Sequence, residues 1–182
     1  GKSLEKFDPR LFISIGLSLM AIAHAWRTFA TPDITFLQIA LPTMLIGVGM
    51  VMFIIPVTGL AMASVNSDET ASAAGVSNFM RTIAGAFGAA LVQTGWSNSA
   101  RENQTELASG MTNGAQTLEG FVAGGATPEQ AVASLSHIVE GQSVMLATND
   151  TFGVIAILFA ISATLIWIAP RPKGPIDSSA GH

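Results

Sequence analysis

Residues 34–67 read ITFLQIALPTMLIGVGMVMFIIPVTGLAMASVNS and contain no Asp, Glu, Lys or Arg. A second stretch without these residue types, TFGVIAILFAISATLIWIAP, fills residues 151–170. A charge-free apolar stretch of about 18 or more residues is the signature of a helix that crosses a membrane. Soluble proteins rarely need several such stretches in one small chain. The pattern therefore predicts an integral membrane protein.

The composition agrees with this prediction. The 182 residues are 49% hydrophobic and only 11% charged, whereas a soluble domain carries about 25% charged residues. The absence of cysteine excludes disulfides, thiolate metal sites and cysteine nucleophiles. The net charge of −4 comes without a basic stripe that would suit nucleic acid. No enzyme motif is present, so we expect no catalytic residue, metal site or bound cofactor.

The apolar segments predict an all-α bundle with four membrane-spanning helices. The predicted spans lie at about residues 11–29, 35–63, 72–96 and 149–169. A loop at residues 1–10 precedes them, and a Pro-rich tail at 170–182 follows. The opening residues lack both a starting Met and an apolar signal core, which suggests a piece of a longer protein.

A polar segment at residues 97–148 separates the third and fourth spans and is predicted to lie outside the membrane. A helix is expected to begin within it at about residue 128. Thr127 can cap this helix, Pro128 suits its first position, and Gln130 completes a capping box.

Two spans contain residues that change how a helix bends or packs. Pro42 and Pro56 lie inside the second span, where each removes one helical hydrogen bond and favours a kink. Gly85 and Gly88 lie in a run of small residues in the third span. The pairs Ala84/Gly88 and Gly85/Ala89 are each four positions apart. Small residues at this spacing let another helix approach closely, so tight packing or a sliding gate surface is expected there.

Basic residues predict the orientation of the chain. Arg27 and Arg101 lie on one side of the predicted topology, and Arg81 lies close to the other side. The remaining basic residues are all on the side of Arg81, and they are Lys2, Lys6, Arg10, Arg171 and Lys173. The positive-inside rule then places both termini in the cytoplasm and the polar segment on the outside.

Three polar residues near or within the spans are candidates for function. Arg81 lies about two turns into the third span, with Asn78 one turn earlier. An arginine at the bilayer centre costs about 2.5–3.5 kcal/mol on insertion scales. Its side chain can extend to the interface, or it can pair with a carboxylate in a water-filled cavity. Asp150 begins the fourth span, either as a silent interfacial carboxylate or as a group that takes up a proton or attracts a cation.

Taken in order, these stretches resemble the EmrB/QacA family of drug/proton antiporters, which are fourteen-helix members of the major facilitator superfamily. The strongest match is GVGMVMFIIPVTGLAMASVNSDETASAAGVSNFMRTIAGAFGAALVQT at residues 47–94. The opening GKSLEKFDPR, the TNDTF at residues 148–152 and the Pro-rich end are similar to the EmrB branch. The resemblance covers essentially the whole chain and implies helices eleven to fourteen, the last part of the C-terminal bundle.

The resemblance also implies a function. A complete protein of this kind would sit in the bacterial inner membrane and export amphipathic or hydrophobic drugs, with the proton gradient as its energy source. In the EmrB branch it would work with a periplasmic adaptor and an outer-membrane channel. Asn78, Phe79, Arg81, Gly85 and Gly88 map onto the family's third-span pattern, with Arg81 and Asn78 as cavity or gating positions.

Two classes of function therefore stay open. The first is a proton-coupled multidrug exporter, of which this chain is a portion without the antiporter motif and acidic residues of the first half. These four helices alone are then expected not to transport. The second is a self-contained four-helix scaffold or anchoring subunit that binds a partner through its outer segment.

Overall fold

The structure is a computed structural model that describes residues 8–31, 34–62, 65 and 69–168. The elements found there are all helical, with no strand among them, which confirms the predicted all-α class. They are α1 (Pro9–Arg27), α2 (Phe36–Met62), α3 (Thr70–Gly110), α4 (Gly114–Ala123), α5 (Pro128–Leu165) and the 3-10 turn η3 (Ile166–Ile168). The predicted tail at 170–182 and most of the loop at 1–10 lie outside the described residues.

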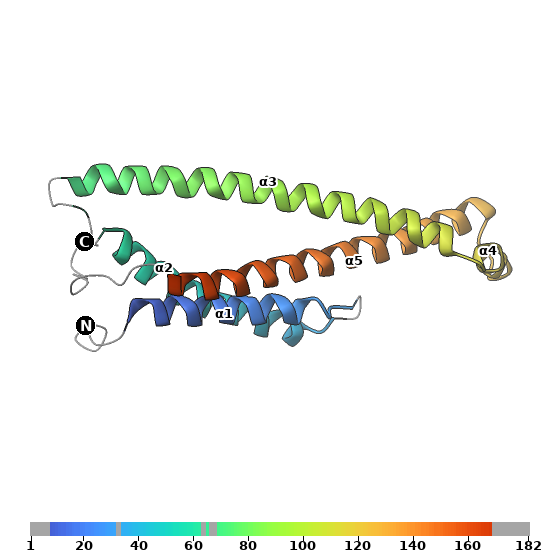
Figure 1. The fold of residues 1–182 in the computed structure, drawn as a ribbon. Coiled ribbons are helices and arrows are strands. Elements are labelled where there is room, and N and C mark those ends of the chain that lie inside the picture. The colour runs from blue at the N-terminus through green and yellow to red at the C-terminus, as the bar shows by residue number, and fades with distance from the viewer. Residues whose placement is uncertain (1–7, 32–33, 63–64, 66–68, 169–182) are drawn as a thin grey trace.

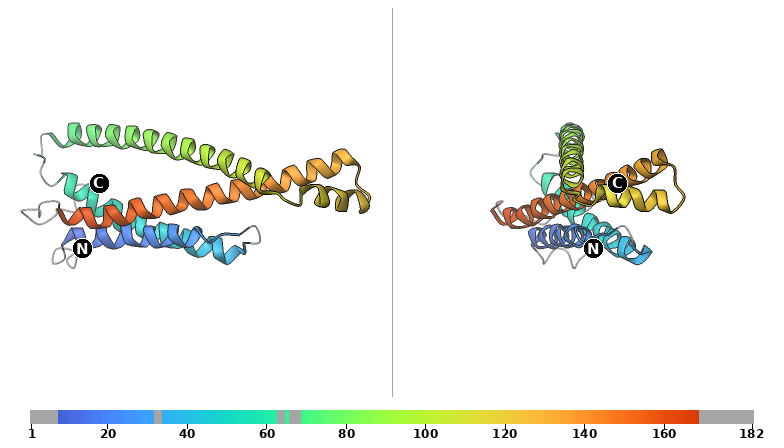
Figure 2. Two further views of the ribbon diagram at one scale, coloured as in Figure 1. Left: turned by 45° about the vertical axis from the view of Figure 1, so that its right-hand side comes forward. Right: turned by 90° about the vertical axis from the view of Figure 1, so that its right-hand side faces the viewer.

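The helices form an elongated bundle with a hairpin at one end. Figure 1 shows α1, α2 and the second half of α5 side by side, while α3 runs above them. The first half of α3 stands apart from α5, and the two helices converge further along, in both Figure 1 and the left view of Figure 2. Helices α3 and α5 continue beyond the ends of α1 and α2 and form a helical hairpin (residues 97–148), with α4 at its tip.

Helix α1 begins two residues before the predicted span because its start is capped. The Asp8 side chain accepts a hydrogen bond from the Arg10 backbone N–H at 3.1 Å, and Pro9 occupies the first turn. Both features favour a helix start. Ile13, Leu17 and Met20 recur with helical spacing and form the buried core of the bundle with Ala163 of α5.

Two glycines bring α1 and α2 into close contact. A Cβ added at Gly16 would lie 2.6 Å from the Gly49 carbonyl oxygen, and one added at Gly49 would lie 2.7 Å from the Gly16 carbonyl oxygen. No larger residue fits at either position without a shift of backbone. Membrane helices gain packing contacts in this way.

Pro42 and Pro56, where the sequence predicts kinks, both lie within α2, which is continuous from Phe36 to Met62. The Pro42 ring is fully buried and Pro56 is half-buried. The kinks predicted at these positions stay a prediction.

Helices α3 and α5 both extend into the polar segment at residues 97–148, for which the sequence predicts a loop with a helix from about residue 128. Helix α3 continues past residue 96 to Gly110, and α5 runs without a break from Pro128 into the fourth predicted span. No proline lies inside either helix, and their glycines are isolated, so nothing in these sequences stops helical hydrogen bonding. The change between apolar and polar sequence at residues 97 and 149 leaves both helices intact.

The predicted start of α5 is confirmed in detail. The Thr127 hydroxyl accepts a hydrogen bond from the Gln130 backbone N–H at 3.3 Å, and the Gln130 side chain accepts one from the Thr127 backbone N–H at 2.9 Å. This reciprocal pair is a capping box.

Three of the helices, α1, α2 and α5, are long and apolar enough to cross a membrane. Their large side chains face outward to a degree that soluble proteins rarely show, for example Phe36 at 81% and Met44 at 69% exposure. Helix α3 is not among the three, because Asn78, Arg81 and Gln93 interrupt its apolar residues. The coarse prediction of a membrane helix bundle is thus confirmed with three candidate spans.

Candidate functional site

Arg81 and Asn78 lie on the exposed first half of α3. Both side chains are exposed, as are residues 81–95 throughout. Within the described part of the chain, the Arg81 guanidinium makes no hydrogen bond or ion pair. The Asn78 backbone carbonyl accepts a hydrogen bond from Thr82 Oγ1 at 2.9 Å. The structure does not bring these two residues to any other candidate side chain.

Unlike Arg81, the two arginines of α1 each donate a hydrogen bond to another element, although the buried Nε of Arg10 has no hydrogen-bond partner among the described residues. Arg10 is only 6% exposed, donates from a terminal nitrogen to the Trp167 carbonyl at 3.4 Å and lies 4.0 Å from Asp8. Arg27 donates to Thr43 Oγ1 at 2.6 Å and lies over the Phe152 ring at 5.3 Å. Arg81 differs from both because its guanidinium has no hydrogen-bond or ion-pair partner among the described residues.

Gly85 and Gly88 face open space in this chain. A Cβ added to either one would meet nothing within 4 Å. The close packing predicted for them therefore requires a helix other than the described ones, and it stays a prediction.

Asp150 lies where α5 forms hydrogen bonds to α3 and to the segment that follows α1. Its Oδ2 atom accepts a hydrogen bond from Ser99 Oγ of α3 at 3.1 Å, and the preceding Thr148 accepts one from the Trp96 indole N–H at 3.0 Å. Between them, Asn149 donates to the Ala30 carbonyl at 3.0 Å. Three consecutive side chains of α5 thus tie it to α3 and to the end of α1, which gives Asp150 a structural partner.

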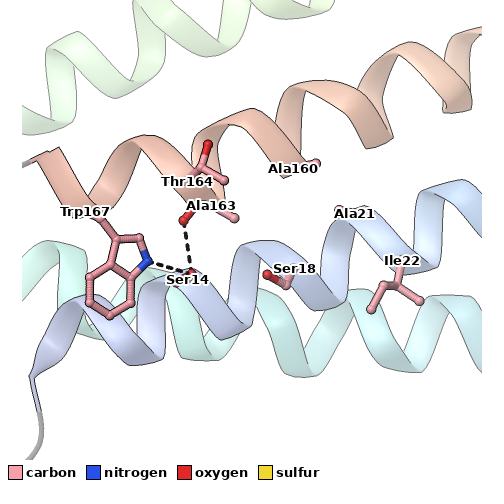
Figure 3. A pocket seen from close by; sticks show the side chains of 8 residues that line it. All are labelled: Ser14, Ser18, Ala21, Ile22, Ala160, Ala163, Thr164 and Trp167. Atoms are coloured by element: carbon pink, nitrogen blue, oxygen red, sulfur yellow. Dashed lines mark hydrogen bonds between the residues drawn. The ribbon is translucent and has the colours of Figure 1, made fainter.

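An open pocket of about 400 Å³ lies between α1 and α5. Figure 3 shows Ser14 near Trp167, where its hydroxyl donates to the Ala163 carbonyl at 3.0 Å and accepts from the Trp167 indole N–H at 3.3 Å. The remaining lining residues are small or apolar, and they are Ser18, Ala21, Ile22, Ala160 and Thr164. The Ser14 hydroxyl is thus hydrogen-bonded on both sides, and the lining of the pocket is mainly apolar.

Sequence reasoning missed the Gly16–Gly49 crossing and this pocket. The signals were present as Gly16 in the apolar zone of α1 and as Ser14 and Ser18 one turn apart on one helix face. Neither pattern indicates which residues it contacts, because those residues belong to another helix that is distant in sequence.

The chemistry available in the described ranges is that of binding and packing. No group of three or more His, Asp or Glu side chains that could hold a metal ion occurs among the residues the structure describes. Apolar surface dominates, and some of the polar groups form hydrogen bonds between helices, such as Trp96 with Thr148 and Ser99 with Asp150. Such an arrangement suits passage or anchorage in a membrane.

No protein-family model matches the chain, and no solved structure matches it significantly. Curated proteins do match. The chain is 27% identical over 188 residues to the multidrug export protein EmrB of Escherichia coli, across 100% of this chain and 36% of that protein. It is 26% identical over 185 residues to the fatty acid resistance protein FarB of Neisseria gonorrhoeae, with the same coverage. With the EmrB protein of Haemophilus influenzae it shares 28% identity over 179 residues, which cover 96% of this chain and 35% of the relative.

The chain thus spans little more than a third of the length of the curated relatives it matches. The resemblance to the EmrB branch, seen first in the third-span sequence, is confirmed from one end of the chain to the other. Along its whole length, this chain is a sequence relative of the bacterial multidrug export proteins of the EmrB type.

Proposed function

We propose that this chain is the last part of a multidrug exporter in the inner membrane of a bacterium. The observation that carries the proposal is the end-to-end similarity to proteins named for multidrug export. Because the chain covers only 36% of such a relative, the remainder of the transporter is part of the proposal. These helices alone are transport-incompetent, since transporters of this type place substrate between two halves.

In this proposal α3 also crosses the membrane and provides the third of the four predicted spans, in addition to α1, α2 and α5. Residues 72–96 would extend about 37 Å at 1.5 Å per residue, which is enough to cross a hydrocarbon core of about 30 Å. Large apolar side chains on this stretch support the assignment, with Phe79 exposed at 60%, Phe87 at 69% and Leu91 at 72%. The polar residues on the same helix then face protein or water and avoid lipid.

Both ends of the chain face the cytoplasm, and the helical hairpin at residues 97–148 projects outward. The distribution of Lys and Arg supports this orientation. An outward hairpin is the part of the chain that a periplasmic adaptor would meet, and the adaptor in turn would meet an outer-membrane channel.

The exporter is a secondary active transporter that uses the proton gradient, with no cofactor and no enzymatic step. Its substrates are amphipathic or hydrophobic compounds. The name of the FarB relative, a fatty acid resistance protein, supports amphipathic substrates in particular. Arg81 and Asn78 line the transport path or its gate, while Asp150 has the structural role described above.

Drug susceptibility of cells tests this proposal. The full-length protein is produced in a bacterium that lacks its own exporters, and growth is measured against a lipophilic cation and a long-chain fatty acid. We expect the inhibitory concentration of at least one compound to rise, and a protonophore to abolish the export of that compound. No protection against any compound, with the protein correctly inserted, would favour the scaffold alternative instead.

A further inference from the structure

One side of α3 gathers its small and polar residues around Arg81. Residues three, four and seven positions apart share a face of an α-helix, which places Ser77, Gly85 and Gly88 beside Arg81. The large apolar residues Phe79 and Ile83 fall on the opposite side. Helix α3 therefore has a bulky side suited to lipid and a small-residue side with an unbalanced charge.

The side of Arg81 is the one that turns toward the rest of the bundle. Ser99 lies about five helical turns beyond Arg81, in line with it on an α-helix, and Ser99 contacts Asp150 of α5. Further back along α3 the two helices separate (Figure 2). A Cβ added at Gly85 or Gly88 there would meet nothing within 4 Å, so these two positions are without a packing partner among the described residues.

The positive charge of Arg81 indicates that a partner on this side carries a negative charge. In a membrane, an arginine at this depth needs an opposite charge or access to water. The described carboxylates next to α3 do not lie level with it. Glu69, the residue before α3, is about 18 Å away along the helix axis, and Asp150 is bound to Ser99 about 27 Å away.

A second copy of this chain cannot supply the charge either. All twelve Asp and Glu residues lie outside the apolar stretches at residues 11–32, 34–67, 70–100 and 151–170. A symmetric contact through this side would also bring two Arg81 side chains toward each other, because a two-fold interface repeats the same patch on both copies.

We infer that the Arg81 side of α3 receives an apolar helix that bears an Asp or Glu level with Arg81, supplied by a sequence other than residues 1–182. Charge complementarity identifies the occupant, and Gly85 and Gly88 allow its backbone to come close. The inference rests on the proposed membrane-spanning position of α3. It does not depend on transport itself.

Photo-crosslinking in the full-length protein in native membranes tests this inference. The photoreactive residue p-benzoylphenylalanine replaces Ser77, which is on the Arg81 side, or Phe79 on the opposite side as a matched control. Arg81 is retained in both variants. We expect position 77 to crosslink to an apolar peptide that lies outside residues 1–182 and contains Asp or Glu, and position 79 to lack this product.

A crosslink from position 77 into residues 1–182, or to a span without a carboxylate, would overturn the inference. So would the absence of a protein crosslink in a correctly inserted protein, because it would indicate that Arg81 extends to the interface alone. As a second readout, Arg81→Glu should abolish the crosslink, and reversal of the partner carboxylate to Arg should restore it. Neither readout uses drug export, so failure of the proposed function and failure of this inference are distinguishable.

Discussion

At the scale of single residues, the glycine pair between α1 and α2 makes the most direct stability prediction. Gly49→Ala would place a methyl group 2.7 Å from the Gly16 carbonyl oxygen and 2.9 Å from Met20 Cγ. Overpacking of this kind costs about 1–3 kcal/mol. The expected result is a loss of that size in the unfolding free energy of the full-length protein in detergent, relative to Gly47→Ala.

Gly47 is the matched control for that experiment. It lies one half-turn earlier in the same helix, and a Cβ there meets nothing within 4 Å. Both variants gain the same helix propensity, about 1 kcal/mol, so their difference isolates the contact. Equal stabilities would show that α1 and α2 do not cross at Gly16 and Gly49.

Arg81 makes a functional prediction at the same scale. Arg81→Ala should reduce drug resistance conferred by the full-length protein while its membrane level stays unchanged, because the charge is proposed to act in the transport path. Arg81→Lys keeps the charge but loses the planar donors of the guanidinium, so it separates the two contributions. Resistance that is unchanged in Arg81→Ala at equal protein level would favour a side chain that merely extends to the interface.

Asp150 is predicted to act through its hydrogen bond. Asp150→Asn retains an oxygen that can accept from Ser99, so resistance and stability should remain close to those of the unchanged protein. Asp150→Ala should lose about 1 kcal/mol or less, the typical net value of one hydrogen bond, measured by denaturant unfolding. If Asp150→Asn abolished resistance at an equal membrane level, the carboxylate charge would be functional and this assignment would fail.

At the scale of elements, the sequence predicts the existence of the helices well and their ends less well. Hydrophobicity identifies α1, α2 and the apolar half of α5, because charge-free runs have few other uses. Hydrophobicity cannot show that α3 continues to Gly110 or that α5 is continuous with its polar half, since helical hydrogen bonding continues from an apolar into a polar sequence. The start of α5 is predictable because a capping box is local in sequence, with Thr127 and Gln130 three positions apart.

The cap of α5 also makes a prediction about the hairpin. Thr127→Ala removes the acceptor for the Gln130 N–H and should cost about 0.5–2 kcal/mol. Because the hairpin end is exposed, the loss should appear as faster hydrogen exchange in the first turn of α5. Thr127→Ser retains the hydroxyl and should exchange at nearly the original rate. Equal exchange in the Ala and Ser variants would contradict a stabilising role for the cap.

At the scale of the whole molecule, the candidate site is less predictable than the fold. Arg81 stands out in the sequence because it is the charge that interrupts the third apolar stretch, and Asp150 because it begins the fourth. Their roles depend on partners distant in sequence. The structure supplies the partner of Asp150, and the partner of Arg81 is not among the described residues. A fold can thus be predicted from local periodicity while a site requires every helix that surrounds it.

The central claim, that this chain belongs to a proton-coupled exporter, is tested most directly by proton flux in proteoliposomes. The full-length protein is reconstituted, a pH gradient is imposed, and a lipophilic drug is added while the internal pH is recorded. We predict drug-dependent proton movement that is absent from empty liposomes and from liposomes containing residues 1–182 alone. The absence of drug-dependent flux with any compound in a panel of amphipathic substrates, from a correctly inserted full-length protein, would contradict the claim.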